Sequence, residues 1–109
     1  MMTNCIFCKL VDGSIPTKIV YQDEDIFVFN DINPKAEVHL LIIPKRHIES
    51  MLQLTDADEK LMGKMMITAN KLALLHGLNK GYKTQINTGL GGGQEVFHLH
   101  IHVFGNRSE

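Results

Sequence analysis

Three alternating histidines near the carboxyl end of the sequence are the residues best suited to chemistry. His98, His100 and His102 occur in "HLHIH", shortly after the glycine-rich stretch "GLGGG" at 89–93. Histidine titrates near neutral pH, binds metals and can act as a nucleophile. Glycines let backbone N–H groups approach a ligand closely, and such groups can hold an anion. The segment therefore indicates a metal site or a phosphate site. A third interpretation is that the histidines are solvent-facing residues of a strand and have no function.

Strand geometry indicates that the three histidines have different roles. Side chains alternate between the two faces of a strand, so the three histidines share one face and the intervening apolar residues face the core. Neighbouring histidines then lie about 6.6 Å apart, and the outer two about 13 Å apart. One metal ion bonds nitrogen at about 2 Å, so all three cannot share one ion, whereas two could. The glycine stretch is not a P-loop, because no Lys-Ser or Lys-Thr follows it.

Length and composition limit the class of protein. A chain of 109 residues predicts one domain over residues 1–109, with 44% hydrophobic and 21% charged residues typical of globular proteins. The formal net charge of −1 gives no support for nucleic-acid binding. No apolar run approaches the ~20 residues of a membrane span, and the start has no secretory pattern. We therefore expect a cytoplasmic protein with two reduced cysteines.

The elements that must position the histidines can be predicted from residue patterns. Segments rich in β-branched and aromatic residues predict strands at 17–23, 25–31, 38–44, 82–88 and 97–104. Apolar residues recurring at three- and four-residue spacing predict one long helix from Asp56 to His76. Thr55 suits its N-cap and Gly77 its stop. Together these elements indicate an α+β fold with about five strands in a mostly antiparallel sheet.

The two cysteines form a second candidate site. Cys5 and Cys8 make a CxxC pair, which alone is compatible with metal binding, redox chemistry or two small buried residues. A redox motif would be expected at the start of a helix in a βαβ unit, and no such unit is predicted. Tetrahedral zinc needs two further ligands, for which His47 and His98 are available.

The segment "HLHIHVF" also resembles the motif of the histidine triad superfamily, His-x-His-x-His followed by two apolar residues. "NDINPKAEVHLLIIPKRHI", "GLNKGYKTQINTG" and "GGQEVFHLHIHVFG" resemble the short branch of histidine triad nucleotide-binding proteins. The similarity runs from about Cys5 to Arg107. It implies the histidine triad fold, with a short N-terminal helix beside the long one, and a homodimer.

The resemblance implies a hydrolase that cleaves the P–N bond of purine nucleoside 5′-phosphoramidates through a nucleotidyl-histidine intermediate. It assigns His100 as the nucleophile, His102 as a phosphate contact and His39 as a supporting histidine of the catalytic site. A neutral imidazole that attacks phosphorus must hold its proton on the other ring nitrogen, so we expect an acceptor beside His100. A dinucleoside polyphosphate hydrolase, a nucleotide-binding or protein-interaction module and a small metalloprotein remain as alternatives.

The resemblance also assigns nucleotide-binding residues. Asp31 would accept the ribose hydroxyls, although its position before Asn33-Pro34 also suits a simple turn. The phosphate and leaving group would meet Asn87, Gly93, Gln94 and Glu95, and the purine would meet Phe7, Leu10, Ile15, Phe29 and Ile32. Glu95 stands where animal members often have a serine, which leaves the proton donor open. The same resemblance makes Cys5, Cys8, His47 and His98 the ligands of a structural Zn²⁺.

Overall fold

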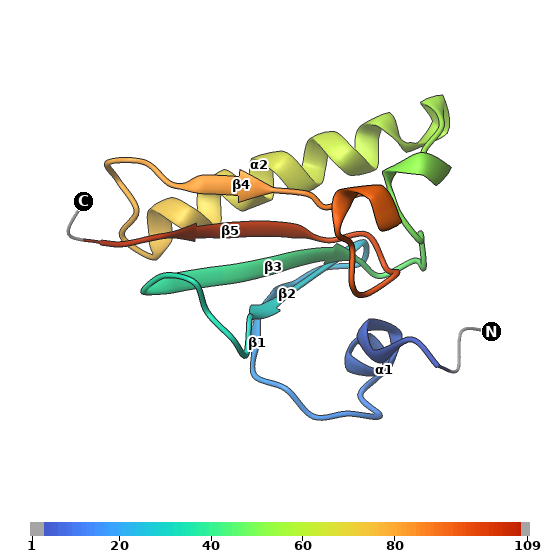
Figure 1. The fold of residues 1–109 in the computed structure, drawn as a ribbon. Helices are drawn as coiled ribbons and strands as arrows, with labels where there is room; N and C mark the ends of the chain where they lie inside the picture. The colour runs from blue at the N-terminus through green and yellow to red at the C-terminus, as the bar shows by residue number, and fades with distance from the viewer. Residues whose placement is uncertain (1–3, 108–109) are drawn as a thin grey trace.

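Five strands form a single antiparallel sheet in the computed structural model, which describes residues 4–107 (Figure 1). The spatial order is β1-β2-β3-β5-β4. The strands are β1 (Ile19–Gln22), β2 (Ile26–Asn30), β3 (Val38–Pro44), β4 (Lys83–Gln85) and β5 (Ile101–Gly105). The helices are α1 (Ile6–Asp12) and α2 (Glu59–Leu75), and the short 3-10 turns are η1 (Met51–Gln53), η2 (Asp56–Asp58) and η3 (Leu90–Gly92). The predicted α+β architecture is confirmed.

The central strand β3 is the one whose limits agree with the sequence prediction. All seven of its residues are buried, because it pairs with β2 on one side and β5 on the other. Its register with β5 places His39 opposite Phe104 and Leu41 opposite His102. The side chains of β3 are therefore the scaffold against which the carboxyl-terminal histidines are placed.

The other strands are shorter than predicted, and the histidine strand begins late. We expected a strand over 97–104, but β5 starts at Ile101. The residues before it leave the ladder because the Leu99 N–H donates to the carbonyl of Ile48, 2.6 Å away. The expected strand over 82–88 is reduced to β4, since the chain turns where Asn87 contacts Gln85 and the loop.

Helix α2 covers one face of the sheet (Figure 1). Thr55 starts this region with a capping box, in which its hydroxyl accepts from Ala57 N and Asp58 accepts from Thr55 N. The first predicted turn is a 3-10 turn, so the α-helix itself begins at Glu59. Gly77 has φ +89° and ends the helix as predicted. The buried cluster on this face consists of Ile26, Val28, Val38, Leu40, Ile42, Met65, Ala69, Leu72, Ala73, Leu78, Ile101 and Val103.

The short helix α1 lies over the opposite face of the sheet (Figure 1). Cys5 caps its start by accepting from the Cys8 N–H, and Gly13 ends it with φ +86°. Phe7 is its buried residue and packs in a second cluster with Phe27, Phe29, Leu41 and Ile43. The face that carries α1 is the one toward which the histidines point, as predicted, since Phe7 contacts the rings of both His98 and His100.

No helix among residues 4–107 has the length and apolar character needed to cross a bilayer.

Candidate active site

A cavity of about 610 Å³ opens beside α1 and the end of β2. It is lined by most of the predicted nucleotide-binding and catalytic residues: Phe7, Leu10, Ile15, Phe29, Asp31, Ile32, Asn87, Gly93, Glu95, His100 and His102. The predicted residues Gln94 and His39 are outside this lining but contact residues that belong to it: Gln94 donates to the Val96 carbonyl at 3.0 Å, and His39 contacts His102. An apolar wall combined with a few polar and titratable groups is the usual anatomy of a small-molecule site.

His100 is fixed in one tautomer by the backbone of His98. The Nδ1 atom of His100 lies 2.7 Å from the carbonyl oxygen of His98. A carbonyl can only accept, so Nδ1 carries a proton, and in the neutral ring Nε2 keeps its lone pair. His100 is buried but lines the cavity, and the edge of Phe7 packs against its ring at 5.2 Å. The acceptor expected beside His100 is therefore present, and the bare nitrogen is available for a nucleophilic step.

His102 and His39 form a hydrogen-bonded pair next to this nucleophile. The Nε2 atom of His39 lies 3.0 Å from Nδ1 of His102 and 3.4 Å from a carboxylate oxygen of Asp31. Burial, followed by the neighbouring His100 and His39, lowers the pKa of His102 to about 4. Burial also lowers the pKa of His39. Both rings are therefore neutral at physiological pH.

Asp31 makes the expected turn contact and also reaches the cavity wall. One carboxylate oxygen accepts from the Asn33 N–H at 2.8 Å, which is the turn contact predicted from the Asn-Pro sequence. The other faces the histidine pair, at 3.4 Å from His39 Nε2 and 3.9 Å from His102 Nδ1. The carboxylate lies at the cavity wall, so a ligand hydroxyl can reach it.

The N–H groups of the glycine loop were expected to be free to hold an anion, and the structure differs from this expectation. The Gly93 N–H donates to the Leu90 carbonyl and the Gln94 N–H donates to the Gly89 carbonyl, each at 3.1 Å. The loop closes on itself in the 3-10 turn η3, so these two amides are engaged in this conformation. Asn87 braces the turn by donating to Gly92 O at 2.8 Å.

The four residues of the CxxC hypothesis come together at the amino end of α1. His98 Nδ1 lies 3.4 Å from Cys5 Sγ, 3.6 Å from Cys8 Sγ and 3.2 Å from His47 Nδ1. His47 Nδ1 in turn lies 3.3 Å from Cys8 Sγ. Tetrahedral zinc, with bonds of about 2.0–2.3 Å, separates its ligand atoms by about 3.3–3.8 Å, so the observed spacing suits that ion.

The protonation state of His98 suits a metal as well. Its Nε2 lies 2.8 Å from the carbonyl of Pro44, which can only accept, so the proton is on Nε2 and the lone pair of Nδ1 faces the cysteines. Metal-binding histidines characteristically hold their second nitrogen in this way. Burial and the neighbouring Cys5 raise the pKa of Cys8 to about 11, so its thiol stays protonated until a cation replaces the proton.

Comparison with known proteins decides the family. A family model described as "Scavenger mRNA decapping enzyme C-term binding" matches residues 4–109. The chain belongs to this histidine triad family. It is 52% identical over 104 residues to Protein HitA of Neisseria gonorrhoeae, covering 95% of this chain and 97% of HitA.

Solved structures agree with this assignment. A HIT family hydrolase from Legionella pneumophila Philadelphia 1 superposes with a TM-score of 0.91 at 47% identity, covering 94% of this chain and 92% of that one. A histidine triad protein from Clostridium difficile gives a TM-score of 0.89 at 39% identity, with 94% and 90% covered. The histidine triad fold implied by the sequence is therefore confirmed.

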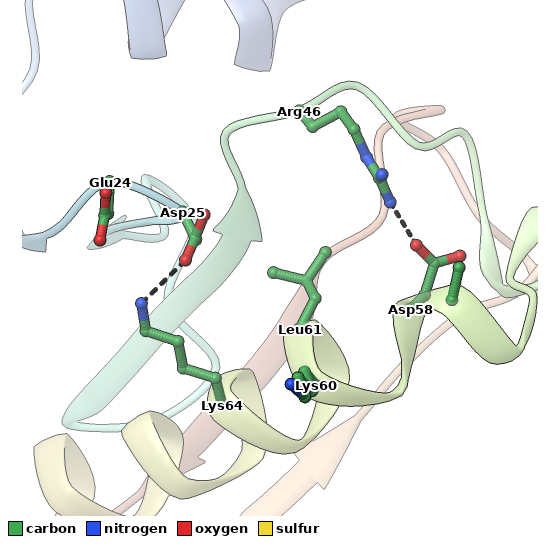
Figure 2. A pocket seen from close by; sticks show the side chains of 8 residues that line it. Glu24, Asp25, Arg46, Asp58, Lys60, Leu61 and Lys64 are labelled. Carbon is green, nitrogen blue, oxygen red and sulfur yellow. Dashed lines mark hydrogen bonds and ion pairs between the residues drawn. The ribbon is translucent and has the colours of Figure 1, made fainter.

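This histidine triad protein has a second depression, of about 370 Å³, between the β1–β2 turn and the start of α2 (Figure 2). Most of its charged side chains form ion pairs: Arg46 pairs with Asp58, and Lys64 pairs with Asp25 at 3.0 Å (Figure 2). None of the six histidines lines it. The ion pairs tie the β1–β2 turn and the segment after β3 to the start of α2, whereas His100 and His102 line the larger cavity.

Sequence reasoning missed several groups that line the larger cavity in this histidine triad protein. Lys35 and Gln85 are among the polar ones, together with Thr17 and Asn33, and Ile6 and Leu41 are among the apolar ones. Gln85 lies two residues before Asn87, so strand alternation could have placed it on the same face. No sequence pattern could have placed Lys35 at the cavity, because its position depends on the turn that follows Asp31.

Proposed function

We propose that the protein hydrolyses the P–N bond of purine nucleoside 5′-phosphoramidates through a covalent intermediate on His100. The observation that carries this proposal is the His100 tautomer: the His98 carbonyl holds Nδ1–H and leaves Nε2 bare at the cavity. The names of two similar structures, HIT family hydrolases from Legionella pneumophila and Clostridium thermocellum, support hydrolysis as the class of reaction.

Two displacements complete the reaction. His100 Nε2 attacks phosphorus, a new N–P bond forms, the substrate P–N bond breaks, and the amine leaves with a proton from water. Water then attacks the same phosphorus, the bond to His100 breaks, and a nucleoside monophosphate leaves. His102 and Asn87 line the cavity and are the side chains suited to hold the phosphoryl oxygens.

The rest of the cavity suits the nucleoside. Phe7 and Phe29 pack edge to face with centroids 5.3 Å apart, and with Leu10 and Ile15 they offer an apolar slot for a base. Asp31 offers the carboxylate oxygens that a ribose diol needs. Glu95 lines the cavity but is exposed to solvent, and we assign the leaving-group proton to water rather than to Glu95.

The test is steady-state hydrolysis of an adenosine phosphoramidate with a fluorogenic amine, comparing wild type with His100→Ala. We expect a loss of at least a thousandfold in kcat/KM, because no other group can form the covalent intermediate. His76→Ala is the matched control, since His76 lies at the end of α2 and does not line the cavity. Equal rates for His100→Ala and wild type would exclude the mechanism.

Lys35 supports a second candidate, the hydrolysis of dinucleoside polyphosphates by the same His100 attack. Its ammonium is a cation at the cavity, which extra phosphate groups would need. Diadenosine tetraphosphate assayed beside the phosphoramidate distinguishes the two. A higher kcat/KM for the tetraphosphate that collapses in Lys35→Gln would favour the second candidate.

We further propose that Cys5, Cys8, His47 and His98 bind a structural Zn²⁺. Support comes from ligand-atom spacings of 3.2–3.6 Å and from the Pro44 carbonyl that frees Nδ1 of His98. The ion would hold α1 against the sheet and takes no part in bond breaking. Metal analysis of protein purified without chelator should give one equivalent of zinc, and Cys8→Ser should lose it. Less than a tenth of an equivalent in wild type would refute this.

A homodimer is the assembly we propose, formed through β4 and α2. Strand β4 is an edge strand whose outer side has no partner among the described strands. Ile67 and Leu74 form an exposed apolar stripe on α2, and Tyr82 links α2 to the start of β4 by donating to Asn70. Light scattering after gel filtration should give twice the chain mass, and Ile67→Asp should lower it. A monomer at micromolar concentration would contradict the proposal.

A further inference from the structure

A hydrogen-bonded chain runs from the backbone at Lys35 to the ring of His102. The Lys35 N–H donates to Nδ1 of His39 at 3.0 Å. Because a backbone N–H can only donate, His39 Nδ1 must be the accepting nitrogen, and the neutral ring must carry its proton on Nε2. That Nε2 lies 3.0 Å from Nδ1 of His102. His39 therefore donates and His102 Nδ1 accepts, which leaves the single proton of a neutral His102 on Nε2.

The same three side chains could also be interpreted as a cation site. Ligand atoms of Asp31, His39 and His102 all lie within 4.8 Å of one another, as in two-histidine, one-carboxylate metal centres. The Lys35 N–H argues against that interpretation. A metal-binding nitrogen must be bare, so Nε2 coordination would move the His39 proton to Nδ1, where it would meet the Lys35 N–H donor to donor. His98 shows the opposite arrangement, because its second nitrogen faces a carbonyl.

We infer that His39 is a positioning residue that takes its tautomer from the Lys35 backbone and thereby fixes His102 as an Nε2–H donor toward the cavity. His39 is 2% exposed and does not line the cavity, so it acts through His102 rather than on a ligand. His102 lines the cavity next to His100, with ring centroids 5.0 Å apart. The contribution of this arrangement to catalysis rests on the proposed function, whereas the inferred tautomer of His102 does not depend on it.

The two histidines at the cavity are thus given opposite tautomers. The His98 carbonyl holds the His100 proton on Nδ1 and leaves Nε2 of the neutral ring without a proton. The His39 ring donates to Nδ1 of His102, so that the His102 proton is on Nε2. One ring can attack phosphorus while its neighbour donates a hydrogen bond to a phosphoryl oxygen. Without His39, the nearest partner for His102 Nδ1 is the Asp31 carboxylate at 3.9 Å, which can only accept. The His102 proton would then move to Nδ1, and the donor toward the cavity would be lost.

Nitrogen-15 NMR of the histidine rings tests this without substrate. In wild type with its zinc retained, we expect the His102 spectrum of an Nε2–H ring. His39→Leu should convert it to an Nδ1–H ring, whereas His39→Gln should keep the wild-type form because its amide N–H can still donate to His102. His76→Leu is the control for loss of a histidine outside the cavity. An unchanged His102 tautomer in folded His39→Leu would overturn the inference.

Two further measurements complete the test. In the phosphoramidate assay, His39→Leu should reduce kcat by about 100-fold with a smaller change in KM, the usual effect of losing one transition-state donor, and His39→Gln should recover most of it. If wild type hydrolyses no nucleotide, the proposed function fails while the NMR result still decides the tautomer. Zinc added beyond the first equivalent should leave the His39 and His102 resonances in place. Stoichiometric shifts at both rings would establish the cation site and overturn the inference.

Discussion

Acid should destabilise this protein through His102, by an amount that can be worked out. Burial brings the pKa of His102 from 6.5 in the unfolded chain to about 4 in the folded one. Between these values the unfolded chain binds more protons, so stability rises with pH and is lost as the pH falls from 6.5 toward 4. Applied to pH 7 and pH 5, the two pKa values give a loss of about 2 kcal/mol from this one ring.

The assay is urea unfolding at pH 7 and pH 5 for wild type and His102→Asn, with zinc present throughout. Other groups titrate in both proteins, so subtracting the two pH effects isolates His102. We expect wild type to lose about 2 kcal/mol more than the variant between the two pH values. Equal losses would show that His102 is solvated and protonates freely. That result would refute the partly buried, neutral ring on which its proposed role as a hydrogen-bond donor depends.

Three substitutions and one control variant, Gly91→Ala, test the scaffold by urea denaturation. Leu40→Ala empties a fully buried position on β3 and should cost about 3 kcal/mol; a loss below 1 kcal/mol would mean that the core collapses around the gap. Gly93→Ala should cost about 1–2 kcal/mol because φ is +75°, whereas Gly91→Ala, at an open position without positive φ, should be near neutral. Thr55→Ala removes the capping hydroxyl and should cost about 1 kcal/mol, and an unchanged midpoint would show that the capping box contributes nothing.

The sequence predicted best what depends on local periodicity. Strand β3 has its predicted limits because seven consecutive residues are buried and Pro44 ends the apolar run. Helix α2 ends at Gly77 as predicted, because its left-handed φ stops the hydrogen-bond ladder. The alternation of faces in the histidine segment was also predicted correctly, since Phe7 contacts His98 and His100 on the side opposite α2.

Contacts between distant segments account for what could not be predicted. The late start of β5 depends on the Ile48 carbonyl, about fifty residues away in the chain, which captures the Leu99 N–H. The engaged amides of Gly93 and Gln94 follow from the turn that the glycine loop makes on itself, and glycine composition does not specify that turn. The tautomers of the histidines likewise depend on carbonyl and N–H groups whose positions only the folded chain defines.

The position of α1 would make the two proposed binding events, of zinc and of a nucleotide, thermodynamically dependent on each other. A helix of seven residues is too short to persist by itself, so its order comes from what it contacts. At one end of the helix, Cys5 and Cys8 lie beside His47 and His98. Along its length, Phe7 and Leu10 form a wall of the larger cavity. A ligand at either place contributes to the same conformational ordering. If zinc and a nucleotide bind as proposed, linkage requires that whatever factor zinc adds to nucleotide affinity, the nucleotide adds to zinc affinity.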